Sequence, residues 1–153
     1  MALFLVQHGK AVPAEIDPER GLTAEGRAEV ERIADVAKGY RVAVRSIVHS
    51  GKKRAWETAE IFAARLGGEI TVTAVPGMDP NDDVASFALK LNAADNTMLV
   101  GHLPFMEKLA AHLITGSGRR PVFKFQNGGI VCLDLDQGTS SWVIIWALMP
   151  RIS

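Results

Sequence analysis

The chain has 153 residues, of which 48% are hydrophobic, and this suits one compact domain with a core of its own rather than two. Seventeen Lys and Arg residues balance seventeen Asp and Glu residues, so we expect neither a nucleic acid nor a membrane as a partner held by overall charge. The single cysteine, Cys132, cannot form an internal disulfide, and no signal peptide or long apolar span stands out. We therefore expect a reducing, cytoplasmic location and a core-packing role for Cys132.

Apolar runs alternate with amphipathic stretches along the chain, which is typical of α/β proteins. The expected elements are a strand over 2–6, a helix from a Thr23 cap to about Lys38, a strand over 42–49, a helix over 52–66, a strand over 70–75, a helix from Asp82 or Asp83 to about Leu91, a strand over 97–100, a helix opened by Pro104 in its first turn and ending near Gly116, and two strands over 129–135 and 141–148. The last two strands are joined by a short turn and predict an antiparallel hairpin. We predict a single domain over 1–153. Its expected fold is a three-layer α/β sandwich, with helices on both faces of a mostly parallel sheet that has antiparallel edge strands.

Two histidines come directly after predicted strands: His8 follows the first strand, and His102 the fourth. Parallel strands end at the same edge of a sheet, where α/β proteins bind ligands. A lone histidine at a strand end is more often structural, whereas two in matching positions favour a functional pair. The ordinary pKa of histidine leaves much of it neutral near pH 7, as a nucleophile or proton carrier requires.

Four short motifs occur in sequence around these histidines: Leu5–Ala11 (LVQHGKA), Leu22–Gly26 (LTAEG), Ser50–Ala59 (SGKKRAWETA) and Val100–Pro104 (VGHLP). Together they resemble the landmarks of the histidine phosphatase superfamily, and their order and short spacing resemble its small SixA branch of phosphohistidine phosphatases. The resemblance implies that His8 is the nucleophile, Arg54 a phosphate-binding arginine and His102 the second catalytic histidine. It also implies that Arg20 lies near the same pocket.

Phosphoryl transfer makes demands that fit these implied roles. The transferred group spreads negative charge over its equatorial oxygens, so the site must offer fixed positive donors. Arg54 supplies such a fork, and a helix beginning soon after Gly9 or Gly101 would add backbone N–H donors. Neutral His8 would attack phosphorus, and water would then hydrolyse the phosphoimidazole. We expect no metal and no other cofactor, because the guanidinium and the second imidazole supply the charge.

One residue departs from the family pattern, which ordinarily has arginine immediately before the nucleophile. This chain has Gln7, which keeps hydrogen-bonding capacity but loses a full charge. We predict that Gln7 still donates a hydrogen bond to a phosphate oxygen, and Lys10 could replace the missing cation. For Lys52 and Lys53 we favour a solvated helix face.

Few acids are available to protonate a leaving group. Asp79 is a weak candidate, and for Asp82 and Asp83 a helix-capping role is favoured. An imidazole leaving group needs less help than an alkoxide, because its ring nitrogen can be protonated beforehand, so a site poor in acids favours P–N cleavage. Short connections also predict an open cleft, which can admit a phosphorylated side chain of another protein.

For most of the remaining polar and aromatic residues we expect structural or solvent-facing roles: Ser50 as a helix cap, His112 as a structural residue, Trp56, Trp142 and Trp146 in packing, and Arg119 and Arg120 as solvated charges. For His49, at the end of the second strand, a place in the pocket and a packing role both stay open. No histidine pair has metal-ligand spacing together with a third carboxylate.

Three functions remain open from the sequence. The first is a phosphohistidine phosphatase acting on a phosphorylated protein. The second is a phosphomonoesterase acting on a small phosphorylated substrate, and the third is a non-catalytic phosphate-binding module in which Gln7 has disabled turnover. The physiological partner and the oligomeric state do not follow from the sequence.

Overall fold

The computed structural model of the chain describes residues 2–92 and 95–152. In these residues six strands form one sheet, in the order β3-β2-β4-β1-β5-β6. The strands are β1 (Leu3–Gln7), β2 (Ser46–His49), β3 (Thr71–Ala74), β4 (Thr97–Gly101), β5 (Ile130–Asp136) and β6 (Ser141–Leu148). Neighbours among β3, β2, β4 and β1 are parallel, whereas β5 is antiparallel to β1 and β6 to β5. The predicted mixed sheet is confirmed.

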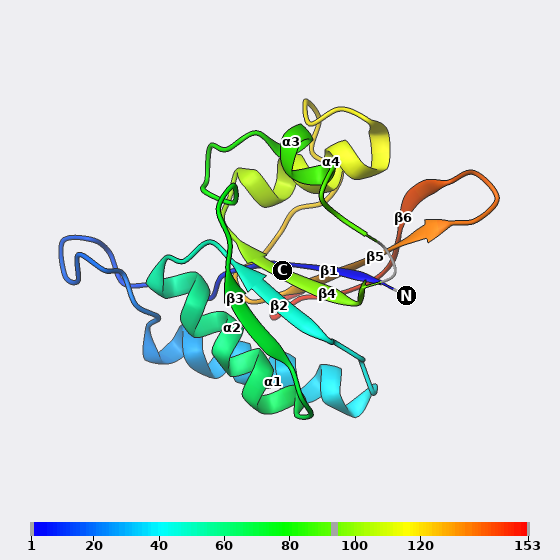
Figure 1. Ribbon diagram of the computed structural model, residues 1–153. Helices are drawn as coiled ribbons and strands as arrows, with labels where there is room; N and C mark the ends of the chain where they lie inside the picture. Colours follow the sequence, from blue (N-terminus) through cyan, green and yellow to red (C-terminus); the bar gives the residue numbers. More distant parts are fainter. Residues whose placement is uncertain (1, 93–94, 153) are drawn as a thin grey trace.

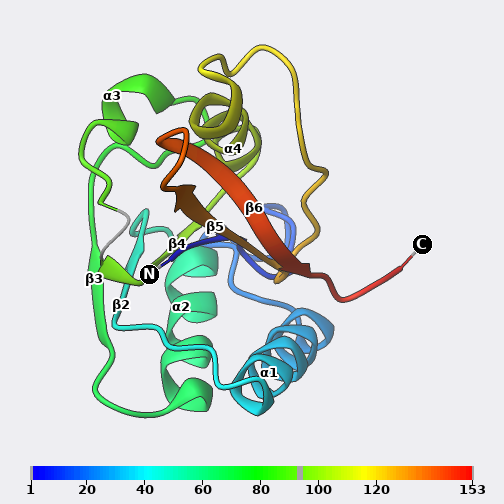
Figure 2. The same ribbon diagram turned by 90° about the vertical axis from the view of Figure 1, so that its right-hand side faces the viewer.

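Helices cover both faces of this sheet. They are α1 (Ala24–Gly39), α2 (Lys53–Leu66), α3 (Val84–Ala88) and α4 (Phe105–Thr115). In Figure 1, α1 and α2 lie below the sheet and α3 and α4 lie above it. Figure 2 shows the same layers from the end at which the parallel strands begin. Each helix pair encloses its own cluster of buried apolar side chains against the sheet. Two clusters form because strands that are covered on both faces carry apolar side chains on both.

The beginning of α1 is tied to the loop that follows β1. Thr23 caps the helix as predicted, and its Oγ1 accepts the backbone N–H of Gly26 at 2.9 Å. The N–H of Thr23 itself donates to the carbonyl of Lys10 at 2.9 Å. A Cβ on Gly9 would lie 2.8 Å from Cγ2 of Val30, and a Cβ on Gly26 would run into the backbone of Lys10. The backbone that follows His8 therefore lies directly on the first turn of α1.

Three predicted boundaries are wrong by a few residues. The second strand begins at Ser46 rather than at residue 42, because the parallel partner opposite Ser46 is Thr97, the first residue of β4. The helix expected to reach Leu91 ends at Ala88, and the chain continues in tight turns whose N–H groups bond three residues back. Pro104 occupies the cap position of α4 rather than its first turn, and its carbonyl accepts the N–H of Lys108 at 3.0 Å.

Replacing Gly26 by alanine tests the close packing of this loop on α1. We expect Gly26→Ala to lower the free energy of unfolding by about 1–3 kcal/mol, because the added methyl group overpacks a contact with rigid backbone. Gly39→Ala is the matched control in the same helix, because a Cβ there meets nothing within 4 Å. The control should be neutral or gain up to about 1 kcal/mol from helix propensity. Urea denaturation measures both, and equal stabilities for the two variants would contradict the packing.

Candidate active site

The carboxyl ends of β1 and β4 bring the two predicted histidines together. The ring centroids of His8 and His102 lie 5.1 Å apart, with the ring planes inclined at 54°. Both rings line a hollow of about 390 Å³. The complete lining is Gln7, His8, Lys10, Ala11, Arg20, Arg54, Pro80, His102, Leu103 and Asn127. The structure thus gathers six of the seven expected site residues around one hollow, and only Gly101 is not among them.

Three hydrogen bonds fix the position and protonation of His8. Its Nδ1 lies 2.7 Å from the carbonyl oxygen of Gly9; because a carbonyl only accepts, Nδ1 carries the proton. In the neutral ring the lone pair is then on Nε2. The backbone N–H of His8 donates to Gly101, and its carbonyl accepts from Nδ2 of Asn127, both at 2.9 Å. Gly101 therefore holds the backbone of His8.

Both imidazoles are neutral at physiological pH. Burial lowers the pKa of His8 to about 4, Arg54 and Arg20 add to this lowering, and the hydrogen bond to Gly9 opposes it. Burial also lowers the pKa of His102 to about 3, assisted by His8 and by the same arginines. A cation close to a histidine disfavours the protonated ring. The unprotonated form that a nucleophile needs is thus the resting state of His8.

Thr58 connects the helix that carries Arg54 to the backbone beside His8. Its hydroxyl donates to the carbonyl of Arg54 at 2.7 Å and accepts the N–H of Gly9 at 2.9 Å. Thr58 is fully buried, so loss of this hydroxyl would leave the N–H of Gly9 without its partner. The sequence analysis assigned no role to Thr58, although its position one helical turn after Arg54 places it on the same face of α2.

Unpartnered polar atoms gather around the hollow. Four buried side-chain polar atoms of the described residues have no hydrogen-bond partner, and three of them are Gln7 Oε1, Arg54 Nε and His102 Nδ1. Each such atom costs about 1–3 kcal/mol when it stays unsatisfied. Native proteins keep such atoms few, so three around one hollow indicate a place where a polar ligand supplies the missing partners.

Two arginines provide the available positive charge. No carboxylate of the described residues lies within ion-pair distance of Arg20 or Arg54, whereas Lys10 Nζ lies 2.9 Å from Glu25 Oε2. Burial, followed by the charge of Arg20, lowers the pKa of Arg54, yet a guanidinium remains protonated in proteins. Lys10 lines the hollow, but its charge is already offset by Glu25.

Ser50 is not the helix cap that we expected. The cap of α2 is Lys52, which makes no side-chain capping bond, and Ser50 Oγ lies 2.6 Å from Nε2 of His102. The turn through Gly51, whose φ is +90°, separates Ser50 from the helix and lets its side chain reach His102. Of the two roles left open for His49, the structure favours packing: it does not line the hollow, it is buried, and its Nδ1 accepts the N–H of Gly51 at 3.0 Å.

No acidic side chain of the described residues lines the hollow. Asp83 caps α3 as predicted by accepting the N–H groups of Ala85 and Ser86, and Asp82 accepts the N–H of Asp79. Of the two glycines expected to precede a helix, Gly101 is followed closely by one, α4 from Phe105, whereas the helix after Gly9 begins only at Ala24. The sequence analysis also overlooked Asn127, which bridges to Gln7 across the end of β1.

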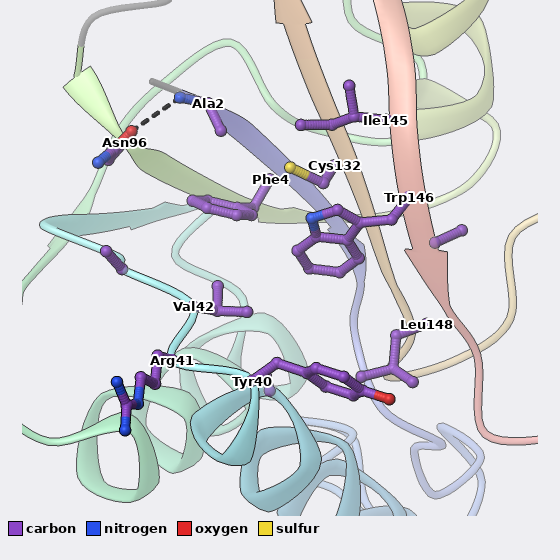
Figure 3. Close-up of a pocket in the computed structure, with 13 residues that line it drawn as sticks. Ala2, Phe4, Tyr40, Arg41, Val42, Asn96, Cys132, Ile145, Trp146 and Leu148 are labelled. Carbon is purple, nitrogen blue, oxygen red and sulfur yellow. Dashed lines mark hydrogen bonds between the residues drawn. The ribbon is translucent and has the colours of Figure 1, made fainter.

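A larger hollow, of about 680 Å³, lies at the other end of the sheet, where β1 begins (Figure 3). Its walls are mostly apolar, with Phe4 and Trp146 side by side and Tyr40 below them. Cys132 packs in the core behind them as predicted, and burial raises the pKa of its thiol to about 12. None of the expected catalytic residues lines this hollow.

The three tryptophans do not share one role. Trp142 and Trp146 pack against the two core clusters as predicted. The prediction for Trp56 is wrong: it is 47% exposed on the outer side of α2.

Across residues 2–92 and 95–152, no group of three or more His, Cys, Asp and Glu side chains is placed to hold a metal ion. Of the helices formed by these residues, none has the length and apolar character needed to cross a membrane.

Comparison with known proteins gives consistent results. Residues 3–79 match the family described as histidine phosphatase superfamily (branch 1). Phosphohistidine phosphatase SixA of Escherichia coli K12 is 29% identical over 151 residues, which cover 93% of this chain and 92% of that protein.

Solved structures extend the comparison to the fold. A structure of the histidine phosphatase SixA complexed with tungstate superimposes with a TM-score of 0.84 at 27% identity, over 98% of this chain and 97% of the other. A candidate phosphohistidine phosphatase SixA from Agrobacterium tumefaciens has a TM-score of 0.77 at 30% identity, over 97% of each chain. Because the family match spans half of the chain and contains His8 and Arg54, this protein belongs to the histidine phosphatase superfamily, branch 1.

Proposed function

We propose that this protein removes the phosphoryl group from phosphohistidine on a phosphocarrier protein, with His8 as the nucleophile. The observation that supports this most directly is the gathering of unpartnered polar atoms and unpaired guanidinium groups around a neutral imidazole. Preorganised donors of this kind stabilise the charge of a phosphoryl group during transfer. The SixA relative that was crystallised with tungstate supports an oxyanion as the ligand.

The proposed reaction has two steps. The lone pair on Nε2 of His8 attacks phosphorus, and the P–N bond of the substrate breaks. Its electron pair becomes the lone pair of the leaving ring nitrogen, and the substrate ring departs neutral because its second nitrogen already carries a proton. Water then attacks the phosphoimidazole on His8, releasing inorganic phosphate and restoring the lone pair on Nε2. Throughout, Arg54 and Arg20 hold the phosphoryl oxygens. In this proposal His102 contacts the same oxygens.

The composition of the hollow favours cleavage of a P–N bond over a P–O bond. An alcohol is a poor leaving group unless an acid protonates it, and no Asp or Glu of the described residues lines the hollow. A phosphorylated imidazole can leave as a neutral ring once its second nitrogen is protonated. The name of the Escherichia coli relative supports the same substrate class. A small-molecule phosphomonoesterase is the second candidate, and a phosphate-binding module without turnover is the third.

A covalent intermediate on His8 tests the proposal and separates these candidates. We expect the protein to dephosphorylate a histidine-phosphorylated carrier faster than any member of a panel of phosphate esters. His8→Asn should lose activity by more than about 10³-fold, as enzymes do when a covalent nucleophile is removed. Mass spectrometry after an alkaline quench should find phosphate on His8. His112→Asn, at a half-buried position on α4 that does not line the hollow, is the matched control and should keep wild-type activity.

Three results would contradict this assignment. Full activity in His8→Asn would exclude His8 as the nucleophile. Faster turnover of a phosphate ester would favour the phosphomonoesterase, and binding of phosphate without any turnover would favour the non-catalytic module.

Gln7→Arg tests how far the departure from the family pattern lowers kcat/KM. We expect kcat/KM for the phosphorylated carrier to rise about 10-fold or more, because a charge-assisted hydrogen bond contributes about 1.5–3 kcal/mol. Gln7→Met, which removes the amide at similar volume, should lower kcat/KM. Steady-state kinetics of the three proteins measures both effects. No gain in Gln7→Arg would show that Arg20 or Lys10 already supplies the charge.

The depressed pKa of His8 predicts that its phosphorylation is not blocked by acid until the pH is unusually low. A group with a pKa of about 4 is neutral at every pH above that value and loses its lone pair only as the pH falls through it. We therefore expect phosphorylation of His8 in single-turnover experiments to be independent of His8 protonation from pH 8 to pH 5. Carbon-13 NMR of labelled histidine measures the protonation directly. Titration of His8 near its ordinary value of about 6.5 would contradict the burial argument.

A further inference from the structure

We propose that Trp56 and the hollow beside it bind the protein substrate next to its phosphohistidine. This inference rests on the proposed function, because it assigns a recognition surface to the same phosphorylated carrier. The surface comprises Trp56 and the residues that share its hollow: Pro18, Glu19, Gly51, Lys52, Lys53 and Arg54. We call it the Trp56 surface.

Trp56 is exposed in a way that packing does not explain. It lies in the first turn of α2 and is 47% exposed, although an indole is among the side chains with most to gain from leaving water. Its Nε1–H donates to Glu60 Oε1 at 3.2 Å, so the ring is oriented by its own helix. A large aromatic side chain that is already oriented loses little entropy on binding, and tryptophan is enriched among the residues that dominate binding energy in protein interfaces.

The Trp56 surface is continuous with the site of phosphoryl transfer. Its hollow has a volume of about 480 Å³. Arg54 lines this hollow and also the hollow that contains both histidines. When the phosphoryl group of a partner protein reaches Arg54 from outside, the part of the partner around that group therefore lies beside Trp56. Other exposed apolar side chains, such as Tyr40 and Leu89, line neither hollow.

Charged side chains surround Trp56 in loose pairs. Lys53 Nζ lies 3.5 Å from Glu19 Oε2 and 3.9 Å from Asp17 Oδ2, and Lys52 Nζ lies 3.9 Å from Asp79 Oδ1. Exposed pairs at such distances contribute little to stability, so they can be exchanged for charges on a partner. An aromatic centre with a polar, solvent-accessible rim is the usual composition of a transient protein interface.

A protein fits this surface better than a small substrate does. A small phosphorylated metabolite makes its contacts within the hollow around His8, which Trp56 does not line. A protein carrying phosphohistidine presents the phosphoryl group together with a flanking surface. Trp56 therefore adds affinity for the carrier and none for a small phosphoramidate.

Trp56→Ala separates docking from chemistry. With a histidine-phosphorylated carrier protein, we expect KM to rise by about 10-fold or more, as for a residue that contributes strongly to an interface, while kcat is unchanged. With phosphoramidate as a small P–N substrate, kcat/KM should stay at the wild-type value. Tyr40→Ala is the matched control, because Tyr40 is a 79% exposed aromatic residue beside the hollow at the far end of the sheet. It should change neither substrate, and Trp56→Phe should restore most of the affinity.

The possible failures are distinguishable. Equal KM for the carrier in Trp56→Ala and wild type, or an equal loss with both substrates, would overturn the docking proposal. If wild type hydrolyses neither substrate, the proposed function fails, and titration of phosphorylated carrier into His8→Asn with and without Trp56→Ala still measures docking. If sedimentation shows that Trp56→Ala converts a wild-type dimer into a monomer, the surface binds a second copy and the proposal is wrong.

Discussion

The hydroxyl of Thr58 is the contact on which the candidate site most depends. It receives the N–H of Gly9 and donates to the carbonyl of Arg54, so one buried atom joins the end of β1 to the first turn of α2. Arg54 and His8 come from parts of the chain about fifty residues apart, and the two hydrogen bonds of this hydroxyl link the backbone beside each of them. A guanidinium that holds an oxyanion contributes to catalysis only when its position relative to the attacking atom is fixed.

Burial has opposite consequences for the histidines and for the arginines. It lowers the pKa of His8 and of His102 so far that both rings stay neutral, and a neutral imidazole is the form that can attack phosphorus. Arg54 is also desolvated, but its ordinary pKa is so high that it remains charged. The same dry environment therefore yields neutral imidazoles beside charged guanidinium groups, a combination that phosphoryl transfer to histidine needs.

Local patterns were sufficient to predict the sheet and most of the site. His8 and His102 follow apolar strands directly, and the C-terminal ends of parallel strands meet at one edge whatever the details of packing. Contacts set by long-range approach were not predictable. Asn127 bonds to the carbonyl of His8, 119 residues away, and Ser50 reaches His102 only because of the turn at Gly51. Whether Trp56 is exposed depends on which other parts of the chain pack on α2, and a local sequence pattern does not contain that information.

The bond between Ser50 and His102 has a consequence for how the second ring meets an anion. Because Oγ occupies Nε2 at 2.6 Å, Nδ1 is the ring nitrogen still free to serve an incoming oxyanion, and it can do so only as a donor. A serine hydroxyl can rotate and either give or accept a proton, so it accommodates both tautomers of the neutral ring. When the hydroxyl donates to Nε2, the ring proton resides on Nδ1, where it can be donated to an anion. The orientation of one hydroxyl and the tautomer of the second imidazole are therefore coupled.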